Sequence, residues 1–327
     1  MDDRPPLLEV RDLRTYFFTR RGIVKAVDGV SFALAPGETM AVVGESGSGK
    51  SVTALSLLRL VPEPAGRIVD GEVLLEGQDV LKLKPREMRR VRGSRISMVL
   101  QDPMTSLNPA FSIGDQVGEA VRLHQRVGGG ELRRRVVEAL SRLKISSAES
   151  RMANYPHQMS GGMRQRVSGA IALSCQPRLL IADEPTTSLD VTIQAQYLEL
   201  LREIQERSHI SIIFITHDFG IVAATAHRVA VMYAGRIVEM GTTEEIFDNP
   251  AHPYTEALLR CVPRSDRLEG RLVDIPGQPP DLANLPRGCS FAARCPRAMD
   301  RCLEAYPPEV EVSPGHVAKC WLAVKES

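Results

Sequence analysis

A glycine-rich segment in the first sixth of the chain carries the clearest chemical pattern. The run GESGSGKS at 44–51 fits the spacing G-x-x-x-x-G-K-[ST]. Glycines let successive backbone amides turn toward phosphate oxygens, the lysine amine reaches those oxygens, and the last hydroxyl suits Mg²⁺. An apolar strand pattern at 39–43 precedes the run and a helical pattern at 51–60 follows it, so a helix N-terminus also favours an anion there. The sequence therefore predicts an ATP phosphate site formed by Gly44, Glu45, Ser46, Gly47, Ser48, Gly49, Lys50 and Ser51.

Further polar residues follow two later apolar runs. RLLIADEP at 178–185 is a buried-strand pattern that ends in Asp183 and Glu184, and SIIFITH ends in His217. Ligands of open α/β sheets bind outside the carboxyl ends of the strands. We expect Asp183 to hold Mg²⁺ and Glu184 to polarise the attacking water as a general base. We expect His217 to contact the γ-phosphate.

The elements that must position these residues alternate between strands and helices, which predicts an α/β fold with a mainly parallel sheet covered on both faces. We expect an ATP-binding core over 1–102 and 176–240, with a helical subdomain at 103–175 inserted into it. Residues 241–327 are richer in proline and cysteine and show little periodicity. They are expected to form a small, loop-rich extension that needs a staple to hold it together.

A short motif distinguishes this chain from other proteins with the same glycine-rich loop, the P-loop. Residues 159–163 read MSGGM, and they resemble the LSGGQ signature of ABC transporter ATPases. The resemblance implies that Ser160, Gly161 and Gly162 bind the γ-phosphate of an ATP held by the opposite subunit. A hydroxyl and two unobstructed amides at a helix N-terminus suit that role. The resemblance covers about residues 7–240 and implies a P-loop ABC ATPase core.

Other residues match this family one by one. Gln101, in LQDPMTSLNP, is similar to the Q-loop glutamine, and the resemblance implies that it joins Ser51 and Asp183 as an Mg²⁺ ligand. Ser188 and Asp190 resemble the D-loop that crosses to the partner site. Phe17 is placed like the aromatic residue that stacks on adenine. The neighbouring Tyr16 is an alternative, and both could instead be strand core.

The C-terminal part carries a second resemblance. NPAHPYTEALL, IPGQPPDL and a cysteine-rich end resemble the C-terminal extension of oligopeptide and dipeptide importer ATPases. Four thiolates can hold Zn²⁺ or an iron–sulfur cluster, but the C-x₂₋₄-C pairs usual in structural zinc sites are missing. The resemblance implies a [4Fe–4S] cluster, with Zn²⁺ or unligated thiols as the alternatives. His316 could be a further ligand, but a lone histidine is more often at the surface, which is where we expect it. The four candidate ligands are Cys289, Cys295, Cys302 and Cys320.

Together the two resemblances imply an ATP-hydrolysing subunit that powers import of peptides or related small solutes. Such a subunit would work with a second ABC ATPase subunit, itself a homologue, in a head-to-tail pair. Two membrane permease subunits and an extracytoplasmic substrate-binding protein would complete the transporter. The chain is then expected to be peripheral, at the cytoplasmic face of the inner or plasma membrane.

The composition and the sequence patterns argue against other functions, such as nucleic-acid binding or a regulatory role without hydrolysis. The chain has 41 basic and 40 acidic residues in 327, and this balance lacks the cationic excess typical of nucleic-acid binding. No apolar run approaches the ~20 residues of a membrane-spanning helix. ABC-type ATPases of DNA repair or translation show a long coiled coil or two cassettes, and neither pattern is present. The intact Lys50, Asp183, Glu184 and His217 weigh against a regulatory subunit without hydrolysis.

Overall fold

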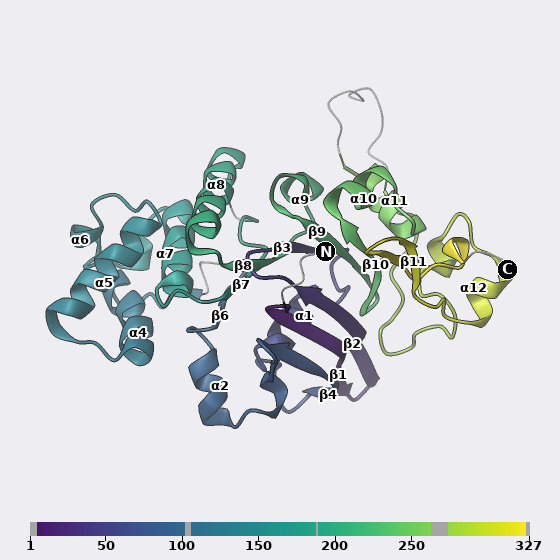
Figure 1. Cartoon of the computed structure of the whole chain (residues 1–327), viewed down its shortest axis with the longest axis horizontal. Helices are drawn as coiled ribbons and strands as arrows, with labels where there is room; N and C mark the ends of the chain where they lie inside the picture. The colour runs from purple at the N-terminus through teal and green to yellow at the C-terminus, as the bar shows by residue number, and fades with distance from the viewer. Residues whose placement is uncertain (1–4, 102–105, 188, 263–273, 325–327) are drawn as a thin grey trace. The chain divides into compact units, whose positions relative to one another are not determined.

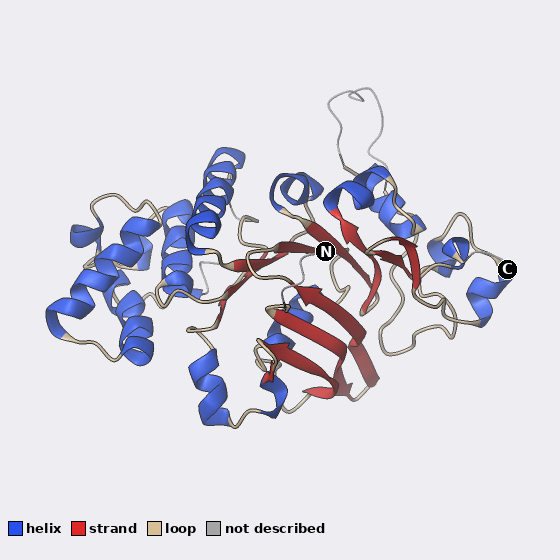
Figure 2. Ribbon diagram, in the orientation of Figure 1, coloured by secondary structure: helices blue, strands red, loops and turns tan. Residues whose placement is uncertain are grey.

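The computed structural model describes residues 5–101, 106–187, 189–262 and 274–324. The chain forms two compact units, each assembled from separate stretches of sequence. The first unit comprises Met1–Leu7, Ala35–Glu38 and Lys82–Phe214, and the second comprises Leu8–Leu34, Thr39–Leu81 and Ile215–Ser327. Figure 1 labels the elements along the chain, and Figure 2 distinguishes helices from strands.

Four strands of the second unit form an antiparallel sheet in the order β2-β1-β4-β5. In β1 the side chains of Leu8, Val10 and Leu13 are buried, whereas Arg11 and Asp12 between them are exposed. One face of this sheet therefore packs against the core and the other meets solvent. Figure 2 shows β1, β2 and β4 side by side. The strands are β1 (Leu8–Thr19), β2 (Gly22–Leu34), β4 (Gly66–Leu75) and β5 (Gln78–Asp79).

Five further strands of the second unit follow the order β11-β12-β10-β9-β3. β3 and β9 are parallel, and all five side chains of β3 are buried, as expected of a parallel strand covered on both faces. The C-terminal hairpin β11–β12 pairs antiparallel with β10, with Glu239 opposite Ala318. The C-terminal region thus extends the sheet that leads into the P-loop. The strands are β3 (Thr39–Val43), β9 (Arg228–Tyr233), β10 (Arg236–Thr242), β11 (Val310–Ser313) and β12 (His316–Ala318).

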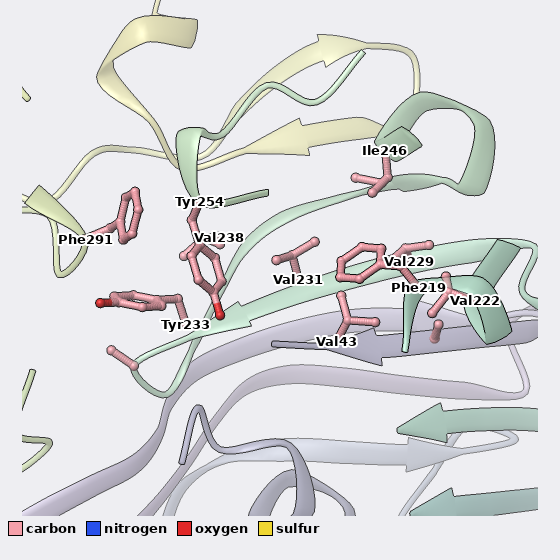
Figure 3. Packing of buried hydrophobic residues seen from close by; sticks show 12 residues of the cluster. Val43, Phe219, Val222, Val229, Val231, Tyr233, Val238, Ile246, Tyr254 and Phe291 are labelled. Carbon is pink, nitrogen blue, oxygen red and sulfur yellow. The ribbon is translucent and has the colours of Figure 1, made fainter. Parts of the chain in front are cut away.

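The core of the second unit continues from this sheet into the C-terminal region (Figure 3). Val43 and Val231 of the strands pack with Phe219, and at the other end of the cluster Tyr254 and Phe291 are buried. Full burial of a phenylalanine contributes roughly 2–3 kcal/mol, so the C-terminal region is held partly by a core it shares with β3 and β9. The helices of this unit are α1 (Lys50–Leu57), α9 (Phe219–Thr225), α10 (Thr243–Asp248), α11 (Pro253–Arg260) and α12 (Asp300–Glu304), with short 3-10 turns η1 (Val80–Lys82), η3 (Ala292–Arg294) and η4 (Trp321–Ala323).

The first unit contains the strand order β8-β7-β6 and a group of helices in which α4, α5 and α7 pack on one another. In α5 the buried side chains Val136, Ala139 and Leu140 recur at helical spacing, which gives that helix one apolar face. The predicted α/β fold class is confirmed. The strands are β6 (Ile96–Val99), β7 (Leu179–Asp183) and β8 (Ser211–Ile215), and the helices are α2 (Pro85–Val91), α4 (Ile113–Gln125), α5 (Gly129–Arg142), α6 (Ala148–Arg151), η2 (Pro156–Gln158), α7 (Gly161–Leu173) and α8 (Val191–Ser208).

Candidate nucleotide-binding site

The P-loop connects β3 to α1 in the second unit, and close packing requires glycine at two of its positions. Gly44 has φ 150° and Gly49 has φ 107°, values that other residues adopt only with strain. A Cβ atom on Gly44 would lie 2.2 Å from the Met232 carbonyl oxygen, and one on Gly49 would lie 2.2 Å from the Ala26 carbonyl oxygen. The loop backbone therefore lies in close contact with its neighbours. Glycines at these positions also suit a loop whose backbone amides bind phosphate.

The charged and polar groups of the loop fit a phosphate ligand. Lys50 is buried, and its amine donates to the carbonyl oxygens of Gly44 at 2.7 Å and Glu45 at 3.0 Å. Within the part of the chain that the structure describes, the buried hydroxyl of Ser48 makes no hydrogen bond. A cation, an unsatisfied hydroxyl and the N-terminus of α1 thus meet in one loop. That combination binds the anionic oxygens of a nucleotide.

The aromatic residues near the end of β1 have different environments. The Tyr16 hydroxyl donates to Asp28 at 2.7 Å, so this side chain belongs to a buried polar contact. The Phe18 side chain is exposed, and the Arg67 guanidinium lies over its ring, 5.4 Å from the ring centroid. Phe17 is half-buried. Its ring lies close to Gly66, where a Cβ would be 2.8 Å from Phe17 Cε1.

His217 follows β8 at the edge where the P-loop begins. The backbone amide of Thr216 donates to the Val42 carbonyl oxygen at 3.3 Å, which fixes this segment to the end of β3. On the other side, Asp218 caps α9 and accepts from the amide of Gly220 at 2.8 Å. The exposed His217 is therefore positioned by a strand contact before it and a helix cap after it.

In the first unit, the structure brings Gln101 and Glu184 together although 83 positions separate them. Gln101 Nε2 donates to Glu184 Oε2 at 2.9 Å, and the Thr187 hydroxyl donates to the same oxygen at 3.1 Å. Glu184 has φ 44°, an uncommon conformation for a residue with a side chain. Such backbone strain is concentrated at functional sites. Asp183, the last residue of β7, is buried directly before it.

The signature residues and Asp190 line one cavity of about 520 Å³ in the first unit. Ser160 is the N-cap of α7, and its hydroxyl accepts from the Met163 amide at 3.4 Å. A Cβ on Gly161 would meet nothing within 4 Å, whereas one on Gly162 would lie 2.7 Å from the Ile193 side chain. Asp190 caps α8 by accepting from the Ile193 amide at 3.0 Å. The other D-loop residue of the prediction, Ser188, lies outside the described residues.

The C-terminal region supplies two P-loop contacts that sequence reasoning missed. The Tyr254 hydroxyl accepts from the backbone amide of Glu45 at 2.8 Å, and Arg294 pairs with the Glu45 carboxylate. No local pattern marks either residue, since each is separated from Glu45 by more than 200 positions. The P-loop is thus supported from outside the residues that form its motif.

The four C-terminal cysteines surround one small cavity, about 10 Å³ in volume, together with His252 and Trp321. Burial raises the pKa of Cys289 to about 11, against the opposing hydrogen bond from the Phe291 backbone amide. Burial also raises the pKa of Cys320, which receives an amide hydrogen bond from Leu322. Thiols with raised pKa values stay protonated at neutral pH unless a metal binds them. Among the described residues, no group of three or more His, Cys, Asp or Glu side chains could hold a metal ion.

The prediction that His316 lies at the surface is wrong. Its side chain is only 2% exposed, and Nε2 lies 2.8 Å from Oε1 of the buried Glu239. Glu239 also accepts from the backbone amides of Ala251 and His252. The hydrogen bond with Glu239 raises the pKa of His316. This buried polar contact joins the C-terminal hairpin to β10.

Two families match successive parts of the sequence, in the order in which their motifs occur. Residues 27–187 match the ABC transporter family, and residues 238–302 match the C-terminal region of oligopeptide/dipeptide transporters. The chain is 51% identical over 316 residues to DppD of Bacillus subtilis, a dipeptide transport ATP-binding protein, covering 97% of this chain and 94% of that protein. The chain belongs to the ATP-binding subunits of peptide ABC transporters.

Two further comparisons support this place in the family. The subunit is 52% identical over 318 residues to y4tR of Sinorhizobium fredii, a probable peptide ABC transporter ATP-binding protein, covering 96% of this chain and 94% of that one. A dimeric bacterial ABC transporter cassette, 25% identical, superposes with a TM-score of 0.65 over 72% of this chain and 98% of its own. This ABC subunit is therefore an ATPase with the fold that its motifs predict. In the residues that the structure describes, no helix is both long and apolar enough to cross a membrane.

Proposed function

We propose that this subunit hydrolyses ATP to power the import of peptides or related small solutes through a partner membrane permease. One observation carries the proposal. The region that matches oligopeptide/dipeptide transporters continues the sheet and the core from which the P-loop emerges. The part that marks the peptide-transport family and the phosphate-binding loop therefore belong to one folded unit.

In the second unit, the P-loop binds the triphosphate. Lys50 exchanges its two carbonyl acceptors for oxygens of the β- and γ-phosphates, and the Ser51 hydroxyl binds Mg²⁺. Phe17 stacks on adenine, because its ring carries no competing hydrogen bond. His217 contacts the γ-phosphate from the end of β8. The buried position of Lys50 supports its role, since a desolvated amine interacts more strongly with phosphate than an exposed one.

In the first unit, Glu184 activates the attacking water. The hydrogen bonds from Gln101 and Thr187 both reach Oε2, so they orient the carboxylate that accepts the water proton. Asp183 and Gln101 would be further Mg²⁺ ligands, and the bound ion would neutralise negative charge on the phosphates. In this step Gln101 and Thr187 position the general base, and Glu184 accepts the proton.

The signature residues act on ATP held by a second ATPase subunit. Ser160, Gly161 and Gly162, at the N-terminus of α7, line one cavity together with Asp190, and a helix N-terminus favours a bound anion. Ser188 and Asp190 are the D-loop residues of this proposal. The related bacterial cassette with the same fold forms a dimer, which supports a shared site. ATP then favours the closed pair, because its γ-phosphate contacts both subunits only in that state.

The complete transporter contains this subunit, a homologous second ATPase, two permease subunits and an extracytoplasmic substrate-binding protein. The subunit is peripheral, at the cytoplasmic face of the inner or plasma membrane. Its core over 1–102 and 176–240, helical subdomain at 103–175 and extension at 241–327 are the functional divisions that the motifs suggest. Support for partner permeases comes from membership of the peptide transporter family.

The four cysteines of the extension hold a [4Fe–4S] cluster in this proposal. They line one cavity, and backbone amides of Phe291 and Leu322 point hydrogen bonds at two of the sulfurs, an arrangement that stabilises bound thiolates. Zn²⁺, the alternative, would bind the four sulfurs at about 2.3 Å each. The ligands are Cys289, Cys295, Cys302 and Cys320.

Isolation of the intact complex tests the transport function. We expect a tagged chain to be purified from detergent-solubilised membranes with two permeases and a second ATPase. Addition of a peptide-loaded binding protein should stimulate ATP hydrolysis by the complex, and Lys50→Ala should abolish it by preventing ATP binding. Copurification without permeases, or hydrolysis indifferent to every peptide in a mixed library, would contradict the proposed function.

A further inference from the structure

A buried arginine of the C-terminal region reaches the P-loop. Arg294 ends the short turn η3, and its side chain is 4% exposed. Its guanidinium forms a bidentate ion pair with Glu45, with Nη1 2.7 Å from Oε2 and Nη2 2.9 Å from Oε1. Glu45 is the second residue of the P-loop. The pair therefore ties the phosphate-binding loop to a residue 249 positions later in the chain.

Every N–H group of this guanidinium has an acceptor. Nε donates to the Pro276 carbonyl oxygen at 2.9 Å, and Nη2 donates to the Ile275 carbonyl oxygen at 3.1 Å. Nη1 donates to the Tyr233 hydroxyl at 3.2 Å. With the two bonds to Glu45, all five donors of the fork are engaged. Lysine has three donors around a point charge and cannot reproduce this planar set of contacts.

The backbone of Glu45 is held from the same region. Its amide donates to the Tyr254 hydroxyl at 2.8 Å. Tyr254 is fully buried, and its ring centroid lies 4.5 Å from that of Tyr233 and 5.3 Å from that of Phe291 (Figure 3). Rings packed in this way have little freedom to move. The C-terminal region thus fixes both the carboxylate and the backbone of one P-loop residue.

The position of Glu45 affects phosphate binding in two ways. Its carbonyl oxygen accepts from the Lys50 amine at 3.0 Å, so a shift of Glu45 also shifts the residues that hold Lys50. Its carboxylate lies in a loop that must receive a triphosphate, and an unpaired negative charge there would repel the ligand. Arg294 removes both problems, because the ion pair holds Glu45 in place and balances its charge.

We propose that Arg294 is a positioning residue of the ATP site, which acts through Glu45 to hold the P-loop in its phosphate-binding conformation. The C-terminal region thereby sets the affinity of the subunit for ATP. This inference rests on the P-loop as the ATP site and requires no metal at the cysteines. It assigns to the C-terminal region a contribution to nucleotide binding in addition to its relation to peptide transporters.

The test compares ATP binding by the full chain with and without this ion pair. Arg294→Met should raise the Kd for MgATP roughly tenfold, within the usual range of coupling between linked sites. In the assembled transporter, KM should rise while kcat changes less. The double variant Arg294→Met/Glu45→Gln should bind no more weakly than Arg294→Met alone, because both changes remove the same ion pair. Arg301→Met is the matched control, since Arg301 is an exposed arginine of the same region stacked on Trp321.

Each outcome decides the proposal. Parental affinity in Arg294→Met overturns it. A double variant that binds clearly more weakly than Arg294→Met also overturns it, because Arg294 and Glu45 would then affect ATP binding independently. If Arg294→Met does not fold, Arg294→Lys decides, with severalfold weaker ATP binding expected at an unchanged Tm and parental affinity as the contradicting result. A parental chain that binds no ATP would instead refute the ATP site itself.

Discussion

Replacing Glu184 by glutamine removes the proposed base and preserves its surroundings. The two side chains have the same shape, and the amide oxygen of glutamine can still accept the hydrogen bonds that Gln101 and Thr187 donate at 2.9 and 3.1 Å. Loss of a general base lowers kcat by about 10²–10⁴-fold. At 1.36 kcal/mol per tenfold, this corresponds to roughly 3–5 kcal/mol of transition-state stabilisation. ATP affinity should stay close to the parental value, since the phosphates bind at the P-loop.

The residues that orient Glu184 should have smaller effects. Thr187→Val removes one hydrogen bond to a partly exposed carboxylate, which is worth about 1–1.5 kcal/mol. That loss lowers kcat by about 5–12-fold. Gln101→Leu removes the other hydrogen bond and also a proposed Mg²⁺ ligand, so its effect should exceed that of Thr187→Val. The expected order of activity is parental, then Thr187→Val, then Gln101→Leu, with Glu184→Gln lowest.

Single-turnover hydrolysis by the assembled transporter, combined with nucleotide titrations, measures this order. Glu206→Gln is the matched control, because Glu206 is an exposed glutamate of α8 far along the chain from the end of β7. It should hydrolyse ATP at the parental rate. A Glu184→Gln variant that turns over as fast as the parent, or a Thr187→Val variant that is slower than Glu184→Gln, would refute the assignment of the base.

Three further predictions concern other parts of the chain. Ser160→Arg should leave ATP binding by the isolated chain intact but abolish hydrolysis by the assembled pair, and loss of binding by the isolated chain would count against a shared site. Cys302→Ser should lower iron and sulfide content in anaerobically purified protein and speed hydrogen exchange after residue 280, while ATP still binds; a colourless parent with one zinc per chain would rule the cluster out. Because Glu239 raises the pKa of His316, protonated His316 stabilises the β11–β12 hairpin fully below about pH 6.5. That stabilisation is lost as the pH rises through the raised pKa, so hairpin hydrogen exchange should accelerate with pH more in the parent than in His316→Gln.

Elements with strong local patterns could be predicted from the sequence. The apolar run at 39–43 is the strand β3, and the helical pattern expected at 51–60 is the helix α1 at Lys50–Leu57. Both patterns lie in adjacent residues, as an unbroken apolar run for the buried strand and as helical spacing of apolar residues for the helix. The glycines of the P-loop could also be predicted, because the motif requires glycine where its backbone packs closely against neighbouring residues.

Contacts of the C-terminal region could not be predicted in this way. Its strands are short, and β12 is defined by pairing with β10 rather than by its own alternation of side chains. His316 was expected at the surface because a lone histidine usually lies there, but the buried carboxylate of Glu239 gives it a partner. The pair between Arg294 and Glu45 joins residues 249 positions apart, and no local signal predicts it.

The conformation of Glu184 was also outside the reach of sequence reasoning. Its place after an apolar strand indicated a carboxylate at the sheet edge, and the structure puts it there. Its φ of 44° and its hydrogen bond from Thr187 depend on how the following turn folds back. Tertiary packing sets these features, so a residue pattern could suggest the role of Glu184 but not the geometry that supports it.

Uptake by a reconstituted transporter tests the central claim most directly. The purified complex, with its binding protein, is placed in sealed liposomes with ATP on the side of this subunit, and entry of labelled peptide is followed together with phosphate release. We expect peptide to accumulate only with hydrolysable ATP, and Glu184→Gln to stop both uptake and phosphate release although ATP still binds. Peptide entry at an equal rate without ATP, or undiminished uptake with Glu184→Gln, would contradict the account of this subunit as the ATPase that powers peptide import.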